Sequence, residues 1–443
     1  MTKMLSKKFP KPSTKCRFFA SYMAKIPQAP PDRILGLVNQ FMNDPNPSKV
    51  DLTVGVYRDN AGNVPTFKSV QNAQHLLHTV PSLRKDLSYL PIIGHPNYRN
   101  KVLNFLFHDG CPEIGPEIIY QDRVSFVQTL SGTGALSVTA RFLSNFISDS
   151  IIIPQLSWAN HANVFKNNGF RNISYYPYYS NEKIVLKDWL NHLINIQKTD
   201  REVTSNSKPS CILLHACCHN PTGLDPTKEQ WDQILDTIYD LNLIPIIDMA
   251  YQGLESGDVL KDSYLLRKVL NKKRYKNWKN GIYLCQSFAK NMGLYGERVG
   301  SLSIILPETN SGNKSTSIRE NIDSQLKQII RSMYSSPPGY GARIVSLILS
   351  DKDLKDQWFL DVKEMVDRLN DVRYKLSQKL NWNSIIDLNQ QHGMFYFTNL
   401  SPIQVERLKN QFAIYLTTDG RLSLSGINDL NVDYICNSIL NVL

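Results

Sequence analysis

The 443-residue chain has no uninterrupted apolar run of the roughly 18 to 20 residues that a membrane-spanning helix needs. It also lacks the cysteine pattern of a disulfide-stabilised secreted protein, because its seven cysteines are odd in number, scattered and mostly within apolar runs. We therefore expect no membrane span and reduced, buried cysteines. With 42% hydrophobic residues, the chain is long enough for a large core and about two domains.

Acidic residues are absent before Asp32, whereas six Lys or Arg side chains fall within residues 1–19. Without that segment the chain carries 44 basic against 39 acidic side chains, a mild excess that gives little support for nucleic-acid binding. The segment is also rich in hydroxyl groups and lacks the continuous apolar core of a secretory signal. We predict a mitochondrial transit peptide over residues 1–19 and a location in the mitochondrial matrix. A plain basic tail is the alternative.

Short apolar runs alternate with amphipathic stretches of helical length, such as KEQWDQILDTIYDL at residues 228–241. Strands that are apolar on both faces are typical of a mostly parallel sheet covered by helices on its two faces. We therefore predict an α/β domain with functional groups at the carboxyl ends of its strands. The expected strands are 124–129, 151–154, 211–218, 243–248, 281–287 and 301–307.

Two histidines and two cysteines within HACCH, residues 215–219, raise the alternative of a zinc site. Structural zinc sites usually draw their ligands from two separated pairs, and no second pair follows here. The run CILLHACC is better interpreted as a buried strand, so we expect no metal.

Residues suited to cofactor chemistry follow the ends of the expected strands. Ser131, Gly132 and Thr133 lead into a helical stretch, where free N–H groups, hydroxyls and the helix dipole favour a phosphate. Asp248 ends an apolar strand, where an unpaired carboxylate would be costly, so it is expected to meet a cation. Lys290 is a candidate Schiff-base lysine. Singly, these residues could equally be a Gly-rich turn, a structural ion pair and a surface lysine.

Together, these features supply what pyridoxal 5′-phosphate (PLP) requires. The cradle at 131–133, with Ser287 and Arg298, would hold the phosphate, Asp248 would face the pyridinium nitrogen, and Lys290 would hold the aldehyde. No other common cofactor asks for all three, so the residues predict a PLP enzyme.

Seven motifs in order connect the chain to a known family: SGTGAL, SWANH, HACCHNPTGLDPT, DMAYQG, SFAKNMGLYGERVGSLS, PPGYGARIV and DGRLSLSG. With them, the chain from about residue 26 onward resembles the aspartate aminotransferases of PLP fold type I, above all the mitochondrial form of yeasts. The resemblance implies a large PLP-binding domain over 69–361 and a smaller α/β domain formed by both chain ends. An N-terminal arm and part of the small domain would occupy 20–68, and the rest of the small domain 362–443.

The resemblance also implies roles for the cofactor residues. Lys290 would form the Schiff base and then act as general acid and base. Asp248 would keep the ring nitrogen protonated, supported by His161, while Asn220 and Tyr251 would hydrogen-bond the phenolic oxygen.

In the same family pattern, Trp158 would stack on the cofactor ring. Tyr89 would reach the phosphate from the partner subunit. That role implies a homodimer with shared active sites.

The implied substrates are dicarboxylates, whose two anionic groups suit two arginine forks. Arg421, assisted by Gly55, matches the family arginine for the α-carboxylate, and Arg331 matches the arginine lent by the other subunit to the side-chain carboxylate. Trp158 and Asn220 would also contact the substrate. Tyr334 and Ser336 depart from the residues that many relatives have near the substrate entrance, Trp and Asn.

The implied activity is the reversible ping-pong transamination of L-aspartate and 2-oxoglutarate to oxaloacetate and L-glutamate. An aromatic or kynurenine aminotransferase would use the same cofactor residues and stays an alternative. A non-catalytic binding relative is the other, although the full set Lys290, Asp248, Arg298, Arg331 and Arg421 argues against it as the only function.

Overall fold

The computed structural model describes residues 22–30, 32, 34–83, 87–120, 122–203, 208–308, 312–387 and 390–443. The predicted transit peptide, residues 1–19, and Cys16 lie outside the described residues. The six cysteines within them are buried and free, as the sequence predicts. Among the same residues, no helix has both the length and the apolar character to cross a membrane.

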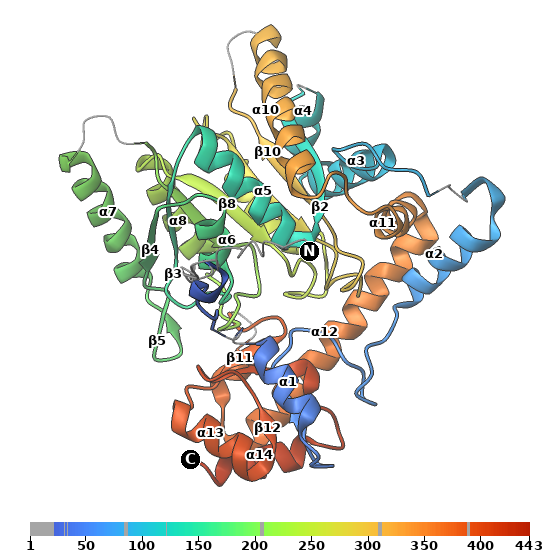
Figure 1. Cartoon of the computed structure of the whole chain (residues 1–443), viewed down its shortest axis with the longest axis vertical. Helices are drawn as coiled ribbons and strands as arrows, with labels where there is room; N and C mark the ends of the chain where they lie inside the picture. Colours follow the sequence, from blue (N-terminus) through green and yellow to red (C-terminus); the bar gives the residue numbers. More distant parts are fainter. Residues whose placement is uncertain are drawn as a thin grey trace, which may run out of the picture.

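A seven-stranded sheet in the order β2-β10-β9-β8-β7-β3-β4 forms the centre of the molecule (Figure 1). Every pairing in it is parallel except those of β10, which runs antiparallel to both of its neighbours. The mostly parallel sheet is therefore confirmed. Its strands are β2 (Val124–Leu130), β3 (Ser150–Pro154), β4 (Asn172–Tyr176), β7 (Cys211–His215), β8 (Ile244–Met249), β9 (Ile282–Ser287) and β10 (Val299–Ile305).

Two of these strands differ from the sequence prediction by more than a shift of one or two residues at their ends. β4 was not expected, because its side chains are exposed or half-buried except at Tyr176, and its sequence lacks the continuous apolar character of its neighbours. The run 211–218 leaves the sheet after His215, three residues early. Cys218 there has a φ of 55°, outside the range of a strand, and its N–H donates to the Asp225 carboxylate at 2.6 Å.

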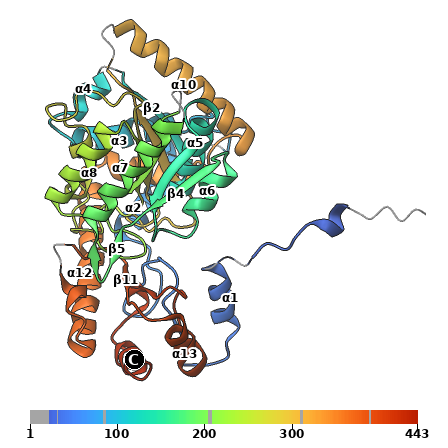
Figure 2. The same ribbon diagram turned by 90° about the vertical axis from the view of Figure 1, so that its left-hand side faces the viewer.

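Helices cover both faces of the sheet, as predicted (Figures 1 and 2). As an example, α8 (Lys228–Asp240) begins with a capping box, in which the side chains of Thr227 and Gln230 each accept a hydrogen bond from a backbone N–H. One face carries α5 (Ser131–Phe146), α6 (His161–Asn167) and α10 (Gly312–Met333). The other carries α3 (Pro96–Leu103), α4 (Gly115–Tyr120), α7 (Leu186–Val203), α8 (Lys228–Asp240) and α9 (Tyr264–Val269), with α2 (Lys68–Thr79) and α11 (Tyr340–Ser350) beyond them.

The two ends of the chain meet in a smaller α/β layer below the sheet (Figure 1). β1 (Val50–Asp51) pairs in parallel with β12 (Ile414–Tyr415), and β11 (Phe395–Phe397) pairs antiparallel with β13 (Arg421–Ser423). The helices here are α1 (Leu35–Asn43), α13 (Pro402–Phe412) and α14 (Val432–Leu440). Both chain ends thus contribute to one unit, as the resemblance implies.

α12 (Lys352–Leu380) joins the two layers as one continuous helix. It contacts α2 and α11 on the side of the sheet, and α14 on the side of the smaller layer. The domain boundary expected after residue 361 falls inside this helix.

Short β5 (Tyr179–Ser180) and β6 (Lys183–Ile184) form a separate antiparallel pair. Short turns of tighter or wider helix lie at Tyr22–Lys25, Pro81–Leu83, Asn104–Asp109, Lys261–Ser263, Asn383–Ile386 and Leu424–Gly426. The first of these, at Tyr22–Lys25, extends away from the body of the molecule (Figure 2). Its Tyr22 is 86% exposed, so the described residues of this chain leave its apolar ring in solvent.

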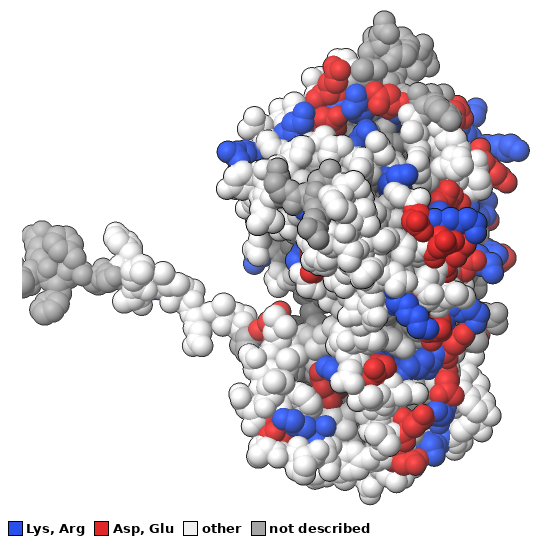
Figure 3. All heavy atoms as spheres, turned by 90° about the vertical axis from the view of Figure 1, so that its right-hand side faces the viewer, with Lys and Arg blue, Asp and Glu red and all other residues white. Residues whose placement is uncertain are grey.

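Charges of both signs are interspersed on the face shown in Figure 3. On α12, exposed charges of opposite sign form ion pairs four residues apart, such as Lys363 with Asp367. Such pairs at exposed positions contribute little to stability, since solvent screens them.

Candidate active site

A cavity of about 340 Å³ opens at the carboxyl edge of the sheet. Because β10 is antiparallel, its first residue lies at the same edge as the last residues of β2 and β9, which places Arg298 there too. Twelve residues predicted from the sequence line the cavity: Gly55, Ser131, Gly132, Thr133, Trp158, Asn220, Asp248, Tyr251, Ser287, Lys290, Arg298 and Arg421.

Hydroxyl groups and an arginine gather at the end of the cavity where β2, β9 and β10 meet. Ser131 begins α5 with a φ of 60°, and its Oγ lies 2.7 Å from Oγ of Ser287. Arg298 donates from Nη1 to the carbonyl of Tyr295 at 3.1 Å, which leaves other guanidinium N–H groups for a ligand. Hydroxyls, helix-start N–H groups and a guanidinium together suit a phosphate.

The carboxylate of Asp248 is held from behind by a chain of polar groups. His161, fully buried, contacts Asp248 Oδ2 through Nε2 at 3.1 Å, and its Nδ1 lies 2.6 Å from Ser157 Oγ. Burial raises the pKa of Asp248, but the hydrogen bond and charge of His161, with His215 and Lys290, more than offset it and hold that pKa below its usual range. Asp248 therefore presents a negative charge to the cavity.

Lys290 stands on the turn after β9, with its Nζ 4.9 Å from the centre of the Tyr251 ring. Burial lowers the pKa of this amine; the Asp248 carboxylate opposes that shift, and the Arg298 cation adds to it. A lysine with a lowered pKa is suited to nucleophilic and acid–base chemistry.

Arg421 brings a buried cation to the opposite side of the cavity, where it is only 4% exposed. Its Nη1 donates to Asn220 Oδ1 at 3.2 Å and its Nη2 donates to the carbonyl of Thr53. Asn220 in turn donates from Nδ2 to the Tyr251 hydroxyl at 3.4 Å. Burial lowers the pKa of Arg421, and the nearby Tyr251 and Asp419 oppose that shift.

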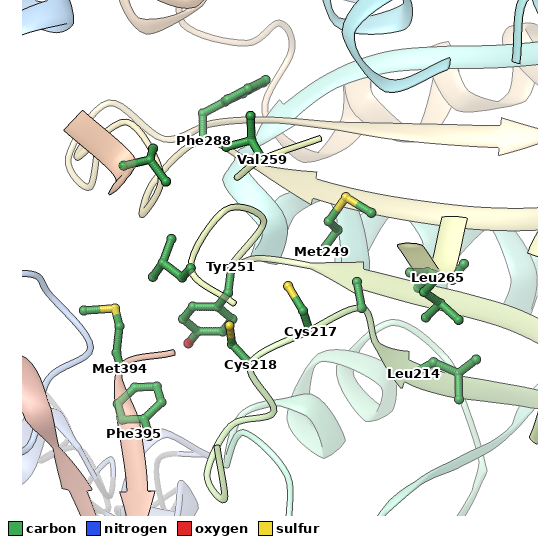
Figure 4. Packing of buried hydrophobic residues seen from close by; sticks show 14 of the residues in the cluster. Leu214, Cys217, Cys218, Met249, Tyr251, Val259, Leu265, Phe288, Met394 and Phe395 are labelled. Carbon is green, nitrogen blue, oxygen red and sulfur yellow. The ribbon is translucent and has the colours of Figure 1, made fainter. Parts of the chain in front are cut away.

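Phe395 of the smaller layer lies beside Tyr251 among buried apolar side chains (Figure 4). The Phe395 ring lies edge-on to Tyr251, with centroids 6.1 Å apart, and its face meets the Arg421 guanidinium at 4.4 Å. Gly55 approaches Phe395 so closely that an added Cβ would lie 2.6 Å from Cζ. Phe395 thereby couples the smaller layer to the large one at the cavity.

The cavity fits PLP on the evidence of its own unpartnered atoms. Oδ1 of Asp248 and Nε of Arg421 are buried without a hydrogen-bond partner among the described residues. Buried polar atoms are rarely left unpaired, so both point to a bound molecule with a donor for the carboxylate and an acceptor for the guanidinium. A pyridinium N–H and a substrate carboxylate are such groups.

Three predicted residues do not line this cavity: His161, which lies behind Asp248 as expected, and Tyr89 and Arg331. Tyr89 and Arg331 lie together in a second pocket of about 360 Å³, with Leu90, Ile92, Ser335 and Ser336. Tyr89 is 94% exposed, and Arg331 donates from Nη1 to Ser335 Oγ on its own helix end.

Sequence reasoning missed several residues of the site. Ser157 lies in SWANH, from which the sequence predicted only Trp158 and His161 as site residues. His215 lies in HACCH, where it was considered only as a zinc ligand and as part of a family motif. His215 lies near both His161 and Asn220, and its pKa is lowered to about 3 by burial and by the charge of His161, against the opposing Asp248 carboxylate. No sequence pattern marked Thr53 or Phe395 as a site residue, because both reach Arg421 only through contacts between segments far apart in the sequence.

The histidines of HACCH do not form a metal cluster within the part of the chain that the structure describes. His219 stacks on Tyr178 at 3.8 Å between centroids, and its Nδ1 lies 2.8 Å from Thr222 Oγ1. The group of potential ligand atoms close enough for an ion in those residues is instead Cys217, Glu255 and Asp262.

Comparison with known proteins places these features in context. Residues 47–439 match the family model described as aminotransferase class I and II. The mitochondrial aspartate aminotransferase of Saccharomyces cerevisiae is 56% identical over 95% of both chains. Among solved structures, the cytoplasmic aspartate aminotransferase of the same yeast has a TM-score of 0.86 and 38% identity over 95% of this chain and 98% of its own. An aromatic-amino-acid aminotransferase of Burkholderia pseudomallei, covalently bound to pyridoxal phosphate, has a TM-score of 0.82 and 33% identity over 96% and 100%.

Proposed function

The chain belongs to the class I and II aminotransferase family, and from this premise we propose how its cavity carries out the reaction. It is a PLP-dependent aspartate aminotransferase. In the first half of the reaction L-aspartate gives up its amino group and leaves as oxaloacetate; in the second, 2-oxoglutarate takes the amino group and leaves as L-glutamate. The observation that carries the mechanism is the meeting of Asp248, Lys290 and Arg421 in one cavity.

Three groups of residues would hold the cofactor. The hydroxyls and N–H groups of 131–133, with Ser287 and Arg298, would take the phosphate. The unpartnered Oδ1 of Asp248 would accept the ring N–H, with His161 fixing the carboxylate from behind. Asn220 and Tyr251 would contact the ring hydroxyl, and Trp158 would pack on the ring.

When bound, PLP supplies the electron sink that stabilises negative charge at the substrate α-carbon. Asp248 keeps that sink effective, because its lowered pKa maintains a negative charge beside the ring nitrogen. Lys290 Nζ, the amine to which the aldehyde would attach, would take the proton from the substrate α-carbon and deliver it to C4′ of the cofactor. Its lowered pKa brings it nearer the working pH, where a general base is most effective.

Arg421 would bind the α-carboxylate of every substrate. Its contacts with Asn220, Thr53 and Phe395 hold the guanidinium plane before the substrate arrives, so little ordering is needed on binding. The free Nε leaves an N–H for the incoming carboxylate. Gly55 lines the same side of the cavity.

We propose that the side-chain carboxylate is bound by Arg331 of a second copy of the chain. Arg331 and the exposed Tyr89 share a pocket outside the cavity, so neither lines the active-site cavity of its own chain. A homodimer in which each copy offers this pair to the other would give each site a phosphate contact from Tyr89 and a second arginine fork.

The mitochondrial relatives support a mitochondrial location. We propose the matrix as the compartment and residues 1–19 as the transit peptide. We also propose that 20–68 with 362–443, and 69–361, act as the two domains, which meet at the cavity through Phe395, Gly55 and Arg421.

The experiment is a coupled assay of the protein lacking residues 1–19, with aspartate, phenylalanine or kynurenine as donor to 2-oxoglutarate. We expect a strong preference for aspartate, and loss of that preference in Arg331→Leu. Equal use of the aromatic donors, unaffected by Arg331→Leu, would keep the cofactor chemistry but contradict the dicarboxylate assignment.

A further inference from the structure

Gln128 stands between the two chain segments that carry Tyr89 and Arg331. It lies on β2, three residues before Ser131, and is fully buried. β2 is the edge strand of the sheet, so its outer side is free to bond to loops. Gln128 uses that side for two of them.

The first loop follows Tyr89. The backbone N–H of Gln128 donates to the carbonyl of Ile93 at 2.9 Å, and its side-chain Oε1 accepts from the N–H of His95 at 3.0 Å. Gly94 between them has a φ of 107°, and an added Cβ would lie 2.3 Å from Gln128 Cβ. The loop therefore lies directly on the Gln128 side chain.

The second loop follows Arg331. The side-chain Nε2 of Gln128 donates to the carbonyl of Pro338 at 2.8 Å, and the hydroxyl of Tyr334 reaches the Gln128 carbonyl at 3.5 Å. One buried amide thus has its acceptor bonded to one loop and its donor to the other. A buried amide loses stability when either partner is missing, so this arrangement fixes the two loops relative to each other.

We propose that Gln128 is the positioning residue that sets the spacing of Tyr89 and Arg331 in their shared pocket, and so aligns both with a partner's active site. The inference rests on the proposed roles of these two residues in the homodimer. Gln128 touches neither substrate nor cofactor. It acts through the loop at 91–95 and the loop at 334–338.

Oε1 and Nε2 of Gln128 bond to different loops, so substitutions can disturb the loop of Tyr89 and the loop of Arg331 separately. We call these two sets of contacts the Tyr89 arm and the Arg331 arm. Gln128→Leu, similar in volume, removes both side-chain bonds. Gln128→Glu keeps the acceptor for His95 but loses the donor for Pro338, so it releases mainly the Arg331 arm. Gly94→Ala displaces mainly the loop of Tyr89, because its Cβ would lie 2.3 Å from Cβ of Gln128, which is anchored in the sheet.

One measurement reports the position of Arg331, and a second reports the position of Tyr89. The first is the ratio of second-order rate constants for aspartate and for alanine in the single-turnover half-reaction, because only aspartate has a side-chain carboxylate for Arg331. The second is the dissociation constant of PLP, measured by absorbance titration, which reports the Tyr89 contact. Misplacement by about 1 Å can cost up to roughly 100-fold, so we expect changes of about 10-fold or more in Gln128→Leu for both readouts.

In Gln128→Glu the aspartate-to-alanine ratio should fall while PLP affinity is kept, and in Gly94→Ala the reverse should hold. The control is Gln252→Leu, another fully buried glutamine whose Nε2 bonds Val259 and Ser263 away from both loops. It should lose stability without changing the aspartate-to-alanine ratio. If Gln128→Leu does not fold, the other two variants carry the test.

The inference is overturned if folded Gln128 variants slow both donors equally, or leave both readouts unchanged, while Arg331→Leu collapses the ratio. If Arg331→Leu itself leaves the aspartate-to-alanine ratio unchanged, the proposed role of Arg331 is wrong, and the inference falls with it. The two failures are therefore told apart by the Arg331 variant alone.

Discussion

The cavity of Lys290 and the pocket of Tyr89 and Arg331 differ in how their polar side chains are held and in how far they are exposed. In the cavity two charged groups are held by polar partners within the chain: Asp248 contacts His161, and Arg421 bonds to Asn220 and Thr53. In the pocket, Tyr89 is 94% exposed, and Arg331 bonds to Ser335, two residues past the end of its own helix. We call the cavity, whose polar groups are held by contacts within the chain, the prepared half of the site, and the pocket of Tyr89 and Arg331, where Tyr89 is exposed, the proposed second half. From this difference we propose that the proton chemistry depends on one chain and the choice of dicarboxylates on two.

The largest effect should come from the prepared half. Replacement of Lys290 by Ala removes the group that moves the α-proton, so we expect turnover to fall by about 10⁴-fold or more, at the upper end for loss of a general base. The phosphate cradle and Asp248 remain, so PLP should still bind, although without its covalent attachment. Single-turnover kinetics and absorbance titration measure the two quantities. Turnover near the wild-type rate would contradict the assignment of Lys290.

The two arginines offer a direct contrast between the halves. Arg421→Leu should lower kcat/KM for aspartate and for alanine alike, because both donors have an α-carboxylate. Arg331→Leu should lower it for aspartate alone, by about 10- to 100-fold, the worth of a hydrogen bond to a charged group. Parallel assays of the two donors check this. The account of two distinct carboxylate sites is wrong if the two variants show the same pattern.

The smallest effect concerns protonation inside the prepared half. Burial and the charge of His161 lower the pKa of His215 from 6.5 to about 3 in the folded chain. As pH falls below about 6.5, the unfolded chain therefore binds this proton first, and the free energy of unfolding decreases until about pH 3. His215→Gln removes this proton uptake, so its stability should decline less between pH 6.5 and 4.

Urea unfolding of the cofactor-free protein and of His215→Gln at several pH values tests the point. A difference between the two proteins that stays constant with pH would show that His215 titrates alike in the folded and unfolded states.

The sequence predicts the residues at strand ends in the cavity better than it predicts residues whose positions depend on strand direction or on distant contacts. Ser131, Asp248, Ser287 and Lys290 follow or end apolar runs, and parallel strands bring their carboxyl ends to one edge, so sequence alone could assemble them. Arg298 lies at the same edge of the sheet because β10 is antiparallel to β2 and β9, and no local sequence pattern indicates that direction. The early end of β7 at His215 was also beyond the sequence, since it depends on the Asp225 carboxylate that takes the Cys218 N–H.

Contacts between distant segments were the least predictable. Phe395 meets Gly55 and Arg421 only once both chain ends have folded into the smaller layer, and Thr53 contributes a carbonyl that every residue has. Gln128 looked like any polar residue in an apolar strand. Its role appears only when the loops at 91–95 and 334–338 are in place.

The most direct test of the divided site mixes two variants that are each impaired with aspartate. Lys290→Ala keeps a functional Arg331 to lend, and Arg331→Leu keeps a functional Lys290 cavity. After the subunits are exchanged, half of the dimers should be hybrids with one complete site in two, so the equimolar mixture should regain about a quarter of wild-type aspartate turnover. Activity equal to the average of the two parent variants would contradict the account, because it would place Lys290 and Arg331 in the same chain's site.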